Sequence, residues 1–154
     1  MLAATPVLAD DDLIFSMSAT EACLSDEKGA ECIGLSAGQC MEDSQGGHST
    51  YGMGGCLSLE IDYWDARLNA AYQALMTNAK KADLFTKESG GHAPSQAETL
   101  REMQRSWIPY RDTRCGFEMS LWGGGTGGGP ASASCYLQLT GEQALYLEDI
   151  GAWY

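Results

Sequence analysis

The sequence predicts an all-α fold in which two long helices form an antiparallel hairpin, flanked by shorter helices and linked by disulfides. Apolar residues recur at spacings of three and four along two long stretches, which is typical of helices packed on one face. The best alternating stretch covers only 136–139, which is too short to build a sheet. Six cysteines, none in a C-x-x-C pair, predict three disulfides and an oxidising compartment.

The first residues predict export. Residues 1–9 (MLAATPVLA) read as the end of a secretory signal, with Val7 and Ala9 at positions −3 and −1 of a candidate cleavage point. No apolar run approaches the roughly 20 residues of a membrane helix. We therefore expect a signal-peptide remnant over 1–9 and, in the periplasm or outside the cell, one helical domain over 10–154. Residues 10–55 form its acidic, cysteine-rich N-terminal extension.

The charge is distributed unevenly. Residues 10–65 hold twelve acids and one base, whereas residues 66–154 hold nine acids and eight bases, within a total net charge of −12. Such a chain repels nucleic acids and anionic membranes. It favours a cationic partner, or it serves solubility alone.

Short helices between cysteines are expected first. Residues 36–39 (SAGQ) fit a capping box that opens a brief turn through Glu42, and 46–50 form a loop. The first long helix then runs from Tyr51 or Leu57 to about Ala82, since glycines near its start leave the first turn open. Its inner face carries Leu57, Ile61, Trp64, Leu68, Ala71 and Leu75.

The second long helix has a clear beginning at Ser95, a favoured N-cap residue, with Glu98 three positions on to complete a capping box. Pro109 lies inside it and removes one backbone hydrogen bond, which predicts a kink. The inner face carries Leu100, Met103, Trp107 and Arg111.

A glycine-rich loop over 123–129 follows. It has no lysine, so it lacks the ending of a phosphate-binding loop. The last helix is predicted to begin at Thr140, with Gln143 at its third position.

The two long helices are expected to face each other. In a symmetric hairpin Leu68 lies level with Trp107, and Asp65 lies level with Arg111. An arginine on the inner face needs a partner, and Asp65, with Asn69 one turn on, is available. We expect a buried Asp65–Arg111 pair that clamps the scaffold; the alternative is that these residues form a polar site.

The residues leave two partners open for Cys115. The hairpin places it near Cys56, whereas a bond to Cys135 would close the glycine loop. Spacing alone does not decide the pairing of six cysteines.

An ordered set of residues runs through both long helices and the segment after them. It comprises Asp65, Leu68, Asn69, Tyr72, Leu100, Gln104, Trp107, Arg111, Asp112, Cys115, the Gly-Gly-Thr at 124–126, Cys135, Leu139 and Thr140. This order and spacing resembles the lysozyme-inhibitor LprI-like family of exported bacterial proteins, over roughly residues 40–148.

The resemblance implies a small, mostly helical domain exported to the periplasm or cell surface. It also implies disulfides between Cys40 and Cys56 and between Cys115 and Cys135, which leaves Cys23 with Cys32. It transfers no catalytic residue to this chain.

The function that this resemblance and the acidic first part imply is binding, not catalysis. We expect a periplasmic or secreted protein that inhibits lysozyme or another cationic wall-acting hydrolase. Its contact surface is expected in the acidic first part or in the glycine loop, with Trp122 and Thr126 as candidate partner-binding residues. The alternative is a structural or assembly factor of the cell envelope without an enzyme target.

No catalytic, metal or cofactor site is predicted. His48 and His92 lie in glycine-flanked loops, where histidines are more often exposed than metal-bound. Asp62 and Asp65, with Glu60 nearby, could act as acid and base in glycoside cleavage, but acids on a helix face are more often solvated or paired. The cysteines are expected to be oxidised, so none is a nucleophile.

Overall fold

The computed structural model describes residues 13–154, so the signal-peptide remnant predicted for residues 1–9 lies outside the described residues. The described part has helices as its regular elements and contains no strand, which confirms the predicted all-α class. Its elements are α1 (Ser18–Ser25), η2 (Gly29–Cys32), α2 (Leu35–Asp43), α3 (Thr50–Glu88), α4 (Gln96–Ser120) and α5 (Gly128–Gly151). None of these helices is long and apolar enough to cross a membrane.

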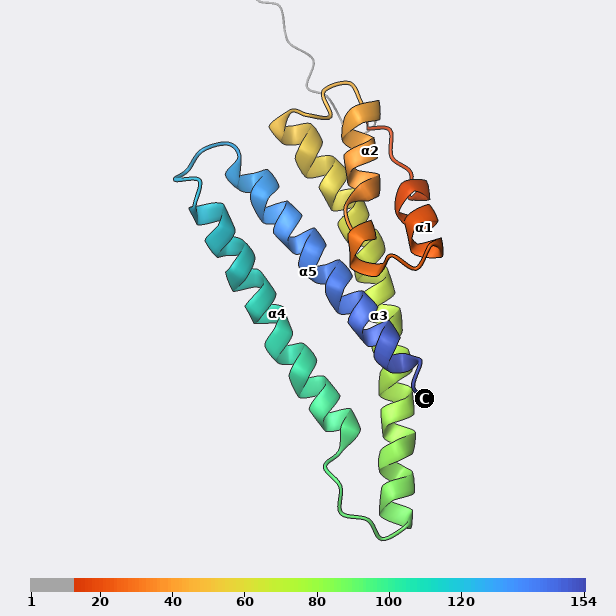
Figure 1. Cartoon of the computed structure of the whole chain (residues 1–154). Coiled ribbons are helices and arrows are strands. Elements are labelled where there is room, and N and C mark those ends of the chain that lie inside the picture. Colours follow the sequence, from red (N-terminus) through yellow and green to blue (C-terminus); the bar gives the residue numbers. More distant parts are fainter. Residues whose placement is uncertain (1–12) are drawn as a thin grey trace, which may run out of the picture.

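The two long helices form a splayed antiparallel hairpin (Figure 1). α3 and α4 meet at the loop that joins them and diverge toward their other ends, and α5 runs back between them and crosses α3. α3 packs chiefly on α5 and less on α2 and α4. α2 lies against the first half of α3, and α1 packs on α2 and η2 (Figure 1). The hairpin predicted from the sequence therefore lacked α5, a third long helix that packs on both α3 and α4.

The main core lies where α2, α3 and α5 meet. Burying one leucine or aromatic side chain contributes about 1.5–3 kcal/mol. The buried residues of this core are Ala37, Leu57, Trp64, Leu68, Leu75, Leu137, Ala144 and Leu147. A smaller cluster of Met76, Ala79 and Ala97 closes the loop end of the hairpin.

α3 begins earlier and ends later than predicted. The Ser49 side chain caps it by accepting from the Gly52 N–H at 3.0 Å. A Cβ on Gly52 would lie 2.2 Å from the carbonyl oxygen of Gly46, so glycine is needed where the preceding turn crosses the first helical turn. Gly52 therefore serves a close approach, and the glycines near the start of α3 do not delay the helix.

α4 is capped from two sides. The Ser95 hydroxyl accepts from the Glu98 N–H at 3.1 Å, as predicted. The second cap is a carboxylate of α3: Asp83 accepts from the Ser95 hydroxyl at 2.6 Å and from the N–H groups of Gln96 and Ala97 at 2.7 and 3.1 Å. These bonds, the one from Ser95 first, lower the pKa of Asp83. The helix continues through Pro109 to Ser120.

α5 begins at Gly128, so the predicted start at Thr140 is wrong. Proline is tolerated in a first helical turn, and Pro130 therefore does not exclude a helix there. Thr140 is buried in the middle of α5, and Gln143 donates to Gln104 of α4 at 3.1 Å. The connection between α4 and α5 is a turn over 121–127, two residues earlier than the glycine loop predicted over 123–129.

Three disulfides link the helices. Cys23 bonds to Cys32, Cys40 to Cys56 and Cys115 to Cys135. The pairing that the family resemblance implies is confirmed, and the Cys56–Cys115 alternative is wrong.

Candidate interaction surfaces

The N-terminal helices α1, η2 and α2 (residues 18–43, the acidic cap) are held to α3 by the buried carboxylate of Glu60. Glu60 has no solvent exposure. Its Oε1 accepts from the Thr20 hydroxyl at 3.0 Å, the Gly34 N–H at 2.8 Å and the Trp64 indole N–H at 3.0 Å. Its Oε2 accepts from the Ala37 N–H at 2.7 Å. One side chain of α3 thus receives donors from α1, from the start of α2 and from its own helix.

The backbone N–H groups at the start of α2 explain this arrangement. The first N–H groups of a helix have no partner within the helix, and the helix dipole favours a negative charge beside them. Gly34, the N-cap residue with φ of 93°, has the left-handed conformation that glycine permits and turns its N–H toward Glu60. The acidic cap is therefore attached to α3 by a carboxylate that accepts hydrogen bonds from the first N–H groups of α2.

The predicted capping box at 36–39 is wrong. α2 begins at Leu35, and the Ser36 hydroxyl accepts from the Thr20 N–H while Thr20 Oγ1 accepts from the Ser36 N–H, each at 3.0 Å. Ser36 therefore joins α2 to α1 and does not cap its own helix.

The burial of Glu60 also affects the possibility that Glu60, Asp62 and Asp65 act as acid and base in glycoside cleavage. Both oxygens of Glu60 are occupied by donors, and no lysine or arginine of residues 13–154 pairs with it. Asp62 and Asp65 are exposed on α3. Glu60 is a structural group, and the sequence signal for it was its place in the apolar stripe between Leu57 and Trp64.

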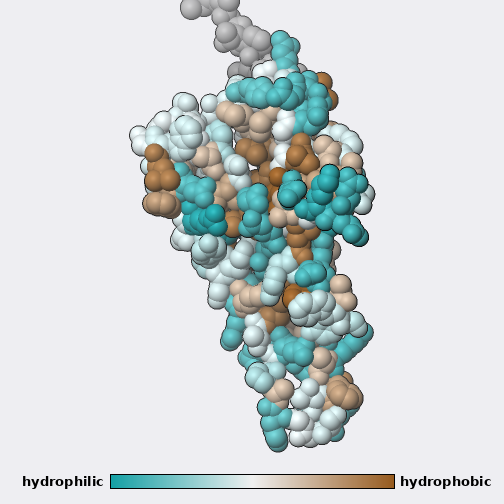
Figure 2. Space-filling model, viewed as in Figure 1, coloured by the Kyte–Doolittle hydropathy of each residue, from teal (hydrophilic) through white to brown (hydrophobic). Residues whose placement is uncertain are grey.

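The outer surface of the cap is strongly acidic. It holds six carboxylates and one lysine, a net charge of −5. All six are exposed: Glu21, Asp26, Glu27, Glu31, Glu42 and Asp43. Lys28 pairs with Asp26 at 3.4 Å. Figure 2 shows hydrophilic residues over α1 and the upper end of α2.

The turn between α4 and α5 (residues 121–127, the apical turn) presents large apolar side chains. Trp122 is 54% exposed, and its ring lies on Gly127, where a Cβ would approach it to 2.2 Å. Thr126 is exposed on the same turn. Phe117, Met119 and Leu121 beside it are also exposed. Figure 2 shows a hydrophobic patch over the end of α4.

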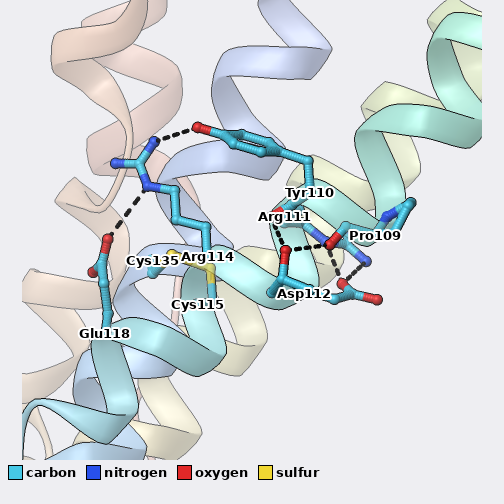
Figure 3. Close-up of a disulfide and its surroundings, with 9 residues drawn as sticks. Pro109, Tyr110, Arg111, Asp112, Arg114, Cys115, Glu118 and Cys135 are labelled. Carbon is cyan, nitrogen blue, oxygen red and sulfur yellow. Dashed lines mark hydrogen bonds and ion pairs between the residues drawn. A yellow bond between two sulfur atoms is a disulfide. The ribbon is translucent and has the colours of Figure 1, made fainter.

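The predicted buried pair between Asp65 and Arg111 is wrong. Asp65 is exposed and accepts from Asn69 at 3.0 Å. Arg111 donates from Nε and Nη2 to Asp112, both at 3.1 Å (Figure 3). Its guanidinium carbon lies 4.9 Å from the ring centroid of Trp107 and 5.1 Å from that of Tyr136. α5 brings Tyr136 to the place where the hairpin alone would have put Asp65.

Tyr136 closes this small cluster from α5. Burial, then the charge of Asp112 and a hydrogen bond to it, raise the pKa of Tyr136, while Arg111 opposes the rise. The neighbouring Cys115–Cys135 disulfide ties the same parts of α4 and α5 together (Figure 3). The cluster therefore joins α4 to α5.

The ion pair that clamps two long helices is Arg67 of α3 with Glu148 of α5. The bonds run from Nε to Oε1 at 2.8 Å and from Nη2 to Oε2 at 2.6 Å. The bond that Arg67 donates to Glu148, together with one that it donates to the Tyr63 hydroxyl, raises the pKa of Arg67 against the effect of burial. The guanidinium carbon also lies 5.0 Å from the Trp64 ring centroid. The sequence did not predict this clamp, because its pattern did not place the last helix against α3.

The remaining motif residues lie between α3 and its neighbours. Leu68 is buried in the main core, and Tyr72 is half-buried against both apolar clusters. Gln104 is 9% exposed. Of the residues weighed as metal ligands, His48 bonds to Glu42 at 3.1 Å and His92 is exposed. No group of His, Cys, Asp and Glu within residues 13–154 could hold a metal ion.

Comparison with known proteins agrees with this architecture. An uncharacterized 17.7 kDa protein in the puhA 5′ region of Rhodobacter capsulatus is 30% identical over 118 residues, which are 76% of this chain and 72% of that protein. No solved structure matches the chain. The model of the family described as lysozyme inhibitor LprI matches residues 40–147, which include the apical turn and exclude α1 and η2. The chain belongs to the lysozyme inhibitor LprI family.

Proposed function

We propose that this protein is an exported binding protein, periplasmic or secreted, that inhibits lysozyme or another cationic wall-acting hydrolase. The family supplies the class of target. The observation that carries the proposal is the acidic cap, whose exposed carboxylates are fixed on α3 by Glu60 and by the Cys40–Cys56 disulfide.

A fixed acidic surface affects mainly the rate of encounter. Complementary charge steers a cationic enzyme toward the correct orientation and raises the association rate constant. The effect is screened over about 8 Å at physiological ionic strength, so it weakens as salt is added. Glu21, Glu27 and Glu31 make no side-chain hydrogen bond or ion pair within the described residues, which leaves their charges available to a partner.

The apical turn is the proposed anchor of the contact. Tryptophan is among the residues that most often dominate the binding energy of an interface. Trp122 is exposed, and its ring is supported by Gly127. The turn also lies within the residues that the family model matches, whereas α1 and η2 precede them. The cap and the turn both lie in the half of the molecule opposite the α3–α4 loop (Figure 1).

Lysis of bacterial cell walls by a cationic lysozyme, followed by turbidity at low salt, tests the proposal. We expect the purified protein to slow lysis, and Trp122→Ala to weaken inhibition about tenfold or more. The matched control is Phe85→Ala, which removes an exposed aromatic near the C-terminal end of α3, far from the apical turn. It should leave inhibition unchanged. Unaltered lysis at a large molar excess of protein rejects the proposal for that lysozyme and favours the envelope-factor alternative.

A further inference from the structure

A polar pocket of about 380 Å³ lies between α3 and α4. It is outside both surfaces used in the proposed function. Its walls carry Asn69, Tyr72 and Gln73 from α3 and Arg101, Gln104 and Arg105 from α4. No carboxylate lines it, although the chain has 21 acids and 9 lysines and arginines.

The two arginines of this pocket differ from the other three. Arg67, Arg111 and Arg114 pair with Glu148, Asp112 and Glu118. Arg101 and Arg105 have no hydrogen-bond or ion-pair partner among residues 13–154. They lie one turn apart on α4, where like charges repel and destabilise the helix. A bound anion would relieve that repulsion.

Gln104 provides a fixed donor beside the two cations. The side chain is 9% exposed, and its Oε1 accepts from Gln143 of α5 at 3.1 Å. Because the oxygen is used toward α5, the amide N–H groups of Gln104 remain for the pocket that this residue lines. The Tyr72 hydroxyl, also without a partner in the described part of the chain, adds a group that can donate or accept.

We propose that this pocket binds a small carboxylate-bearing ligand with neighbouring amide or hydroxyl groups. The arginine fork matches a carboxylate in a bidentate geometry. The amides and the phenol match the neighbouring polar groups of such a ligand. The volume falls within the range of roughly 300–1,000 Å³ that small-molecule sites occupy. A peptide C-terminus and an acidic sugar share this chemistry.

Calorimetric titration of the whole protein with matched probes tests the site. One pair is N-acetyl-Ala-Ala and its C-terminal amide; the other is glucuronate and glucose. We expect saturable binding of at least one carboxylate probe, weakened at least tenfold in the matched neutral compound. The pair that shows this difference identifies the source as peptide or sugar. Absence of saturable binding by both carboxylates, or equal binding of the neutral compounds, overturns the proposal.

Two variants locate the site. Arg101→Gln combined with Arg105→Gln should reduce the affinity of the carboxylate probe at least tenfold while leaving the helical circular dichroism unchanged. Arg114→Gln is the control, because Arg114 lies on the outer face of α4 and bonds to Tyr110 and Glu118 (Figure 3). Equal loss of binding in Arg114→Gln, or full binding by the double variant, contradicts the assignment.

Discussion

Glu60 shows how a buried charge can be satisfied without a cation. Removing an ion from water is costly unless hydrogen bonds replace its hydration. Four donors do so here, two of them backbone N–H groups at the start of α2. The same carboxylate therefore stabilises both the helix and its attachment to α3.

Glu60→Gln tests this role. The amide keeps the size of the side chain but puts an NH₂ group against donors, which leaves at least one buried N–H unpaired. We expect the free energy of unfolding to fall by about 2–3 kcal/mol, measured by urea denaturation. Asp62→Asn, an exposed acid on the same helix, should change it by less than about 0.5 kcal/mol. Equal stability of the two variants would contradict the account.

The two arginine pairs allow a direct comparison at the residue scale. A double-mutant cycle with Arg67→Ala and Glu148→Ala should give a coupling of about 1 kcal/mol, kept modest because both side chains are about a third exposed. The same cycle with Asp65→Ala and Arg111→Ala should give none, since no bond joins them. Coupling in the second cycle and none in the first would restore the hairpin clamp that the structure rejects.

At the scale of elements, α4 depends on a carboxylate of α3. Because the folded-state pKa of Asp83 is lowered below its ordinary value of 3.8, the ionised form stabilises the fold. That contribution is complete above the ordinary value and is lost as the pH falls through the lowered one. Thermal unfolding should show Asp83→Asn less stable than wild type at neutral pH. The difference in melting temperature between the two proteins should narrow on acidification below about pH 4.

The control for this pH dependence is Asp149→Asn, an exposed acid on α5 without a side-chain partner in residues 13–154. It should follow the wild-type curve. If the difference in melting temperature between wild type and Asp83→Asn stayed constant at acidic pH, Asp83 would act by some means other than its charge.

The elements were predictable in unequal measure. Periodicity located α3, and Ser95 located the start of α4. α5 was assigned too late because the glycines and Pro130 read as loop, although Ala133, Leu137, Thr140, Ala144 and Leu147 recur at spacings of four and three. A helix-period pattern that starts in small residues is easily overlooked, and here it supplies three of the eight buried residues of the main core.

Contacts between distant segments were the part that the sequence could not supply. Asp83 accepts from N–H groups at the start of α4, which begins at Gln96. Glu60 does the same at the start of α2, which begins at Leu35. Both are acids near apolar residues, but their donors are known only once the helices are placed. Arg101 and Arg105 were missed for a related reason, since the absence of a counter-charge can only be judged in space.

The whole molecule separates scaffold from surface. The hairpin, most of α5 and the Cys115–Cys135 disulfide lie within the residues that the family model matches, and most motif residues serve their packing. The acidic cap is added at one end through Glu60 and the Cys40–Cys56 disulfide. The exposed charges of the acidic cap can therefore be changed by substitution without altering the packing of the scaffold.

In the proposed function, the acidic cap directs binding to a cationic lysozyme-like hydrolase. The most direct test is the association rate constant with a cationic lysozyme at low and physiological salt. One variant combines Glu21→Gln, Glu27→Gln and Glu31→Gln in the cap. The control removes the same amount of charge at the α3–α4 end through Glu88→Gln, Glu98→Gln and Glu102→Gln.

The cap variant should associate several-fold more slowly at low salt and lose most of its salt dependence, with the dissociation rate little changed. The control variant should match the wild type. No binding by the wild-type protein, or equal slowing in both variants, would contradict the claim.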